Sequence, residues 1–167
     1  MRGRAYPCAL VIVESIRLRL LLIAPLRLGL SVVWLVAARV AGAASGSALI
    51  AVATGAFLIA FFLLNDPRAR FVSHAEEPEP LPAGAALAPA SLHAYHAALP
   101  STVGVSILAG LGLLANPTLT ALLAGILAGL GVVALLYIPR VDGGLYVDPR
   151  QGRLYRKGVE AMPPPAR

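Results

Sequence analysis

Four long runs of apolar residues dominate the pattern of hydrophobic and polar positions along the chain. They cover residues 20–38, 43–64, 101–115 and 119–138. A helix needs about 20 consecutive apolar residues to cross the hydrocarbon core of a bilayer. The pattern therefore predicts four transmembrane helices, of which the third is the shortest and carries several glycines.

Short links join these runs in pairs. Residues 39–42 separate the first run from the second, and residues 116–118 separate the third from the fourth. Short links force consecutive helices to run antiparallel as neighbours. We therefore expect two helical hairpins, one within residues 1–64 and one within residues 101–138.

Two polar segments complete the predicted organisation. Residues 65–100 are rich in proline and glutamate, and we expect a flexible linker followed by an interfacial helix that begins near Ser91. In the tail, residues 139–167, Asp148-Pro149 lies between two short runs rich in tyrosine, valine and leucine, which is typical of a β-hairpin. The predicted fold class is an all-α integral membrane protein, with four transmembrane helices as two antiparallel hairpins and a short C-terminal β-hairpin.

Composition supports a membrane protein and argues against a nucleic-acid partner. The chain is 58% hydrophobic and only 13% charged, whereas soluble domains carry about 25% charged residues. The net charge of +6 does not indicate nucleic-acid binding, because the basic residues flank apolar runs and form no patch interleaved with aromatic residues. The single cysteine, Cys8, excludes an intrachain disulfide and a CxxC site. We expect the lipid bilayer as the environment and no cofactor.

The basic residues also predict how the chain is oriented. Four spans place every basic residue except Arg27 and Arg39 on the side that carries both termini. Lysine and arginine near span ends mark the cytoplasmic side, and the excess of arginine over lysine fits a GC-rich bacterial genome. We therefore expect a multi-pass protein of the bacterial plasma membrane with cytoplasmic N- and C-termini. The alternative, in which residues 8–38 form an in-plane helix and three spans remain, would export the basic tail.

Arg27 is the one charged residue inside the four runs, and it follows Pro25 closely. An arginine at mid-span costs about 2.5–3.5 kcal/mol on insertion scales. Three interpretations are open. The side chain reaches the interface from a tilted span; it binds a polar group of another helix or an anionic substrate; or residues 8–27 lie along the membrane surface, with Glu14 paired to Arg17. Because the runs contain no acidic residue, a buried Arg27 would need an anion from a ligand or a second subunit.

Small residues recur at every fourth position in three of the runs. This spacing places them on one helix face, where they let two backbones approach closely. We interpret them as packing positions within the chain, with a homo-oligomer interface as the alternative. The candidate helix-packing residues are Ser47, Ala51, Gly55, Ser106, Gly110, Ala121, Gly125 and Gly129.

Few residues in the sequence carry chemistry. His93 and His96 share a helix face and, with His74, are candidate metal ligands, but a site needs three or four ligands. We interpret them as the polar face of an interfacial helix, with Tyr95 at headgroup depth, and we expect no metal site. The predicted function is a non-enzymatic accessory or scaffold component that binds another membrane protein or anionic lipid headgroups. The alternatives are a small transporter or channel with Arg27 as its anion site and, third, a metal-dependent membrane enzyme.

Overall fold

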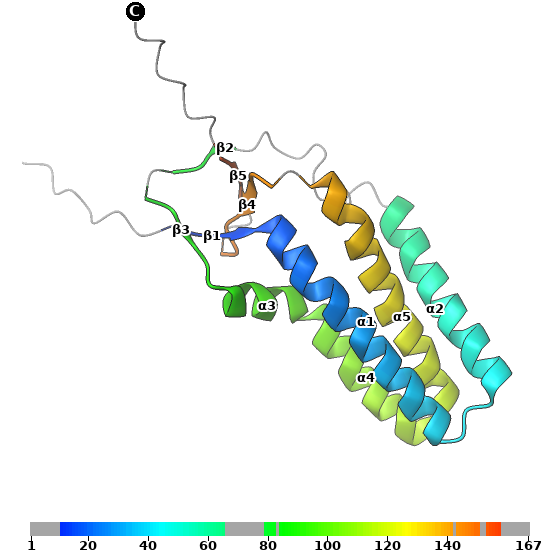
Figure 1. Cartoon of the computed structure of the whole chain (residues 1–167). Helices are drawn as coiled ribbons and strands as arrows, with labels where there is room; N and C mark the ends of the chain where they lie inside the picture. Colours follow the sequence, from blue (N-terminus) through cyan, green and yellow to red (C-terminus); the bar gives the residue numbers. More distant parts are fainter. Residues whose placement is uncertain (1–10, 66–78, 83, 142, 151–152, 158–167) are drawn as a thin grey trace, which may run out of the picture.

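The computed structural model describes residues 11–65, 79–82, 84–141, 143–150 and 153–157. A bundle of long helices carries a small sheet and a short helix at one end (Figure 1). The helices are α1 (Ile16–Val40), α2 (Ser45–Asn65), α3 (Ala90–Ala98), α4 (Ser101–Ala115), α5 (Pro117–Tyr137) and the 3-10 turn η1 (Ile138–Arg140). The strands are β1 (Ile12–Ser15), β2 (Glu79–Pro80), β3 (Ala86–Leu87), β4 (Leu145–Val147) and β5 (Leu154–Arg156). We call the end with the strands the sheet end, and the opposite end, with the α1–α2 and α4–α5 links, the turn end.

Side-chain caps fix where two of the long helices begin. The Ser15 hydroxyl accepts a hydrogen bond from the Leu18 N–H at 3.3 Å, so α1 starts four residues before the apolar run. The Asn116 side chain accepts from the Thr118 N–H at 2.9 Å, and Pro117 occupies the first position of α5. Both helices therefore begin where the sequence supplies an N-cap.

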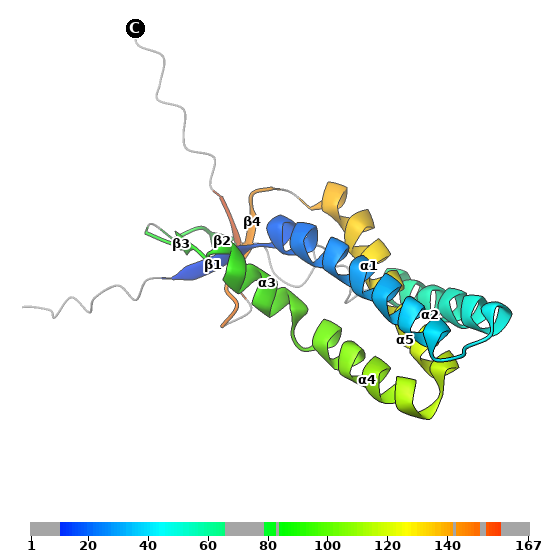
Figure 2. The ribbon, with the colours of Figure 1, turned by 60° about the horizontal axis from the view of Figure 1, so that its bottom comes forward.

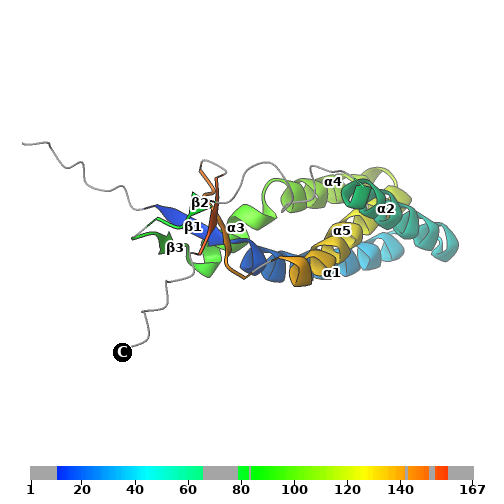
Figure 3. The same ribbon diagram turned by 90° about the horizontal axis from the view of Figure 1, so that it is seen from above.

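Helix α5 is the centre of the bundle, and α1, α2 and α4 all pack against it (Figure 3). The backbones of α2 and α5 are nearly in contact where glycines meet. A Cβ atom at Gly55 would lie 2.3 Å from the carbonyl oxygen of Leu122, and one at Gly125 would lie 2.2 Å from that of Val52. Helix α2 consequently packs mainly on α5, although a short link joins it to α1.

Three helices, α1, α2 and α5, are long and apolar enough to cross a membrane, and α3 and α4 add a fourth if they count as one bent span. The axes of α3 and α4 are bent by 56° at a break that contains Pro100. A short helix that bends there into the third apolar run is what the sequence predicted. Figure 2 shows this bend and the separation of α4 from α1.

The chain is mostly helical, as predicted, but it is not all-α, because a mixed sheet of five strands lies at the sheet end, in the order β2-β5-β4-β1-β3. The tail forms the predicted antiparallel hairpin of β4 and β5. The other three strands were not predicted. Strand β1 pairs antiparallel with β4 and parallel with β3, while β2 pairs parallel with β5. Two pieces of the segment expected to be a flexible linker thus form the two edges of the sheet.

Candidate functional site

A buried carboxylate lies where the sheet meets the helices. The side chain of Glu14, on β1, is fully buried. One of its oxygens accepts a hydrogen bond from Nδ1 of His96, on α3, at 2.5 Å. The other lies 3.5 Å from Nε of Arg19, on α1, an ion pair without a hydrogen bond. Arg19 also donates to the carbonyl oxygen of His96 at 3.4 Å. We call these three residues the Glu14 cluster, and it connects α3 with β1 and α1, which lie far from α3 in the sequence.

The His93 ring also joins α3 to the end of β1, through hydrogen bonds with backbone groups. Its side chain is fully buried, and Nε2 accepts a hydrogen bond from the Ser15 N–H at 2.9 Å. Since Nε2 accepts, the proton lies on Nδ1, which donates to the Pro89 carbonyl at 3.1 Å. Both ring nitrogens are therefore occupied, and neither offers a lone pair to a metal in this arrangement.

The predicted roles of the histidines need correction. Instead of forming a polar, solvated face, His93 is buried, and His96 faces the Glu14 carboxylate. Glu14 pairs with Arg19 and His96, not with Arg17. His74 lies outside the described residues. Within the part of the chain that the structure describes, no group of three or more His, Cys, Asp or Glu side chains could hold a metal ion.

Arg27 lies beside the break between α3 and α4. Its Nε donates to the Thr102 hydroxyl at 2.9 Å, one terminal nitrogen donates to the Ser101 hydroxyl at 3.0 Å, and the other donates to the Leu130 carbonyl at 3.5 Å. The ion pairs found among the described residues do not include Arg27. The guanidinium therefore ties α1 to the start of α4 and to α5 through neutral oxygens, as expected if it binds polar groups of other helices.

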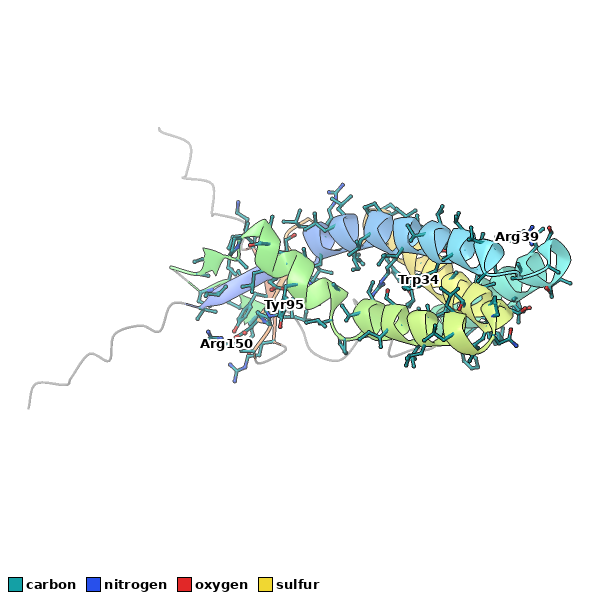
Figure 4. The ribbon with its side chains drawn as sticks, turned by 90° about the horizontal axis from the view of Figure 1, so that it is seen from below. Trp34, Arg39, Tyr95 and Arg150 are labelled. Carbon is teal, nitrogen blue, oxygen red and sulfur yellow. The ribbon has the colours of Figure 1, made fainter. Side chains whose placement is uncertain are left out.

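A groove with a volume of about 510 Å³ separates α1 from α4. It extends from Thr102, beside Arg27, to Gly110 and Trp34, and its lining is mainly aliphatic. Figure 4 shows Trp34 pointing into the space between the two helices. The indole N–H of Trp34 and the hydroxyl of Ser106, both in the lining, are buried and have no hydrogen-bond partner among the described residues.

The candidate packing residues of α2 and α5, except Ser47, lie between these two helices. Gly55 lies against the backbone of α5, and Gly125 lies against the backbone of α2. A Cβ at Gly129 would lie 2.7 Å from the carbonyl oxygen of Ala56. Ala121 belongs to a buried cluster of alanines against which Ala51 packs. Small residues at helix interfaces allow such close approaches of two backbones.

The remaining candidate packing residues have different surroundings. Ser47 is exposed near the turn end, where its hydroxyl donates to the Ala44 carbonyl at 3.0 Å. Ser106 and Gly110 of α4 line the groove, and a Cβ at Gly110 would be 3.5 Å from the Trp34 ring. Ser106 and Gly110 thus border an open space that no other helix in the described part of the chain fills.

Comparisons with known protein families, with curated proteins and with solved structures find no match for this chain. Functional evidence therefore comes from the arrangement of its side chains. The Glu14 cluster attaches the sheet and α3 to the bundle. Arg27 and the groove form a second feature, with a cation at one end and aliphatic side chains along its walls.

Proposed function

We propose that the protein is a multi-pass membrane component that acts as a non-enzymatic accessory or scaffold subunit. The observation that carries this proposal is the distribution of large apolar side chains exposed on all four long helices. Soluble monomers rarely expose contiguous apolar patches larger than a few hundred Å². A bilayer accounts for this surface, because lipid chains cover it at no cost in apolar hydration. Prominent examples are Val32, Val36, Phe57, Phe61, Phe62, Ile107, Leu111, Leu114 and Leu135.

The charged side chains support an orientation with the sheet end in the cytoplasm. Among the described residues, Arg39 is the charged side chain of the turn end, where its guanidinium donates to the Ala43 carbonyl. Positive charge near span ends favours the cytoplasmic side. The described cations of the sheet end are Arg17, Arg19, Arg140, Arg150, Arg153, Arg156 and Lys157.

The sheet end is also the part we expect to bind a partner. The buried Glu14 cluster and His93 hold the sheet against α1 and α3, which makes it a fixed platform. Arg150 and Arg153 are exposed at the turn between β4 and β5 and would suit an acidic surface on another membrane protein. The transporter alternative uses Arg27 as an anion site. Three hydrogen bonds that hold its guanidinium to this chain favour a fixed role over one that cycles during transport.

Cysteine labelling tests insertion and orientation together. In a Cys8→Ala background, we expect Ala44→Cys at the turn end to react with a membrane-impermeant maleimide in intact cells, and Gly143→Cys at the sheet end to react only after lysis. Both positions are exposed in the structure, so folding alone does not shield them. Equal labelling of both sites in intact cells would contradict this topology.

Co-purification in mild detergent tests the scaffold role. We expect the full-length chain to retain a second membrane protein and the double variant Arg150→Gln/Arg153→Gln to retain severalfold less, because the steering charge is lost. Arg39→Gln removes a charge at the opposite end and serves as the matched control. Arg27→Leu should also leave this association intact. A partner lost with Arg39→Gln but kept by the double variant would contradict the assignment of the sheet end.

A further inference from the structure

We propose that the groove between α1 and α4 holds an acyl chain of an anionic phospholipid whose phosphate is bound by Arg27 and Ser101. This inference rests on the membrane location proposed above, and it is independent of any protein partner. Three observations carry it: a cation at one end of the groove that forms no ion pair with any described carboxylate, the short length of α4, and a mainly aliphatic lining.

The Arg27 guanidinium has N–H donors that remain free to bind an anion. A guanidinium carries five N–H donors in a planar fork that suits the oxygens of a phosphate. The Leu130 carbonyl, the Ser101 hydroxyl and the Thr102 hydroxyl together do not use all five. The hydrogen bond to Ser101 is exposed, so a phosphate can reach the remaining donors from outside the bundle. The Ser101 hydroxyl can then donate its own proton to the same phosphate.

The short length of α4 brings a headgroup near Arg27. Fifteen residues of α4 span about 22 Å at 1.5 Å per residue, less than the roughly 30 Å of a hydrocarbon core. Before it comes α3, which turns away by 56° and exposes Tyr95, as expected for a helix at headgroup depth. On this side of the bundle the polar boundary therefore lies at the start of α4, beside Ser101, and the phosphate need not enter the apolar layer.

The direction of the groove matches that of a lipid. Arg27 pairs with Thr102, and farther along Trp34 approaches Gly110, so α1 and α4 run the same way from the sheet end toward the turn end. A phosphate at Arg27 thus directs its chain along the groove into the bilayer, past Leu30. The Ser106 hydroxyl and the Trp34 N–H belong to lining residues but are themselves buried, so the surface that the groove offers to an acyl chain is apolar.

Native mass spectrometry of the full-length protein in mild detergent tests the proposal with dioleoyl phosphatidylglycerol and dioleoyl phosphatidylcholine as probes. We expect one phosphatidylglycerol to bind in clear preference to phosphatidylcholine. Arg27→Gln should weaken phosphatidylglycerol binding on the order of tenfold, because a charge-assisted hydrogen bond is lost. Arg27→Lys should keep part of the preference, and Arg39→Gln, which removes a charge at the turn end, should change nothing.

A second pair of variants tests the acyl chain. Gly110→Leu places a side chain in the groove and should weaken binding of both lipids. Gly104→Leu adds the same side chain on α4 at a glycine with no neighbour within 4 Å and outside the groove lining, so it should leave binding unchanged. Helical circular dichroism of each variant separates lost binding from lost folding, and the Arg27→Lys protein keeps the test valid if Arg27→Gln does not fold.

Four results would overturn the proposal. They are equal affinity of the wild-type protein for the two lipids, unchanged binding by Arg27→Gln, displacement of phosphatidylglycerol by inorganic phosphate at the same concentration, and loss of a co-purifying protein with Gly110→Leu while lipid binding persists. The third would indicate a site for soluble anions, and the fourth a docking groove for a partner helix. Loss of the partner from the Arg150→Gln/Arg153→Gln variant would bear only on the scaffold role, which keeps the two proposals separable.

Discussion

Replacing Gly125 with alanine is expected to destabilise the bundle by about 1–3 kcal/mol, the usual cost of overpacking a close-packed interior. The added Cβ would lie 2.2 Å from the carbonyl oxygen of Val52 and 2.8 Å from its Cα. Both are backbone atoms of α2, so no side-chain rotation can relieve the clash. The two helices would have to separate, and this separation would also remove the close approach at Gly55. Unfolding of the purified protein in detergent, followed by circular dichroism, measures the effect.

The matched control is Gly104→Ala, in the first turn of α4. A Cβ there has no neighbour within 4 Å. Alanine is favoured over glycine in a helix by up to about 1 kcal/mol, so this variant should be neutral or slightly stabilised. Equal destabilisation by the two substitutions, or none by Gly125→Ala, would mean that α2 and α5 do not cross where the structure places them.

Replacing Glu14 with glutamine is expected to release α3 from the sheet end. Glu14 is fully buried, and the change leaves His96 and Arg19 without their anion. Breaking a buried ion pair costs about 3–5 kcal/mol. Because Arg19 and His96 are each about a third exposed, solvent screening reduces the expected loss to roughly 2 kcal/mol. Hydrogen exchange should show faster exchange of the α3 amides, while those of α5 keep their protection.

Glu79→Gln provides the comparison for this second prediction. Glu79 lies on the edge strand β2 and is exposed, so removal of its charge should change stability by less than about 0.5 kcal/mol. If Glu14→Gln behaves in the same way, the buried carboxylate does not hold α3 in place. A uniform increase in exchange across all helices would also count against a local role.

The long helices were predictable because their signal is local and strong. Uninterrupted apolar sequence over about twenty residues leaves few alternatives, and the bounds of α2 and α5 lie within a few residues of the predicted runs. The short helix before Pro100 was also predictable, although Pro89 occupies its N-cap without a side-chain hydrogen bond and the predicted cap, Ser91, lies inside the helix. The tail hairpin was predictable from its turn residues. Arg27 was identified as a candidate binding residue because it is the one charged residue within the four apolar runs.

The sheet and the Glu14 cluster were not predictable, because they depend on pairs far apart in the sequence. Val11-Ile12-Val13 is a β-branched run that favours a strand, but its partners β3 and β4 lie far away in the sequence, so the short run alone does not indicate a sheet. Strands β2 and β3 have two residues each and are defined by hydrogen bonds to distant strands. For example, the Ala86 N–H donates to the Val11 carbonyl at 2.9 Å. Glu14 and His96 are 82 positions apart, and no spacing rule connects them.

The strand order has a consequence for biosynthesis. Strand β1 leaves the ribosome first among the described elements, yet its neighbours β3 and β4 follow only after α2 and after α5. In an unfinished chain, β1 therefore cannot pair with β4 until translation has passed Val147. In the same way, β2 cannot pair until β5 has been synthesised. Closure of the sheet can therefore occur only after all four long helices have been synthesised, because β4 and β5 follow α5 in the chain.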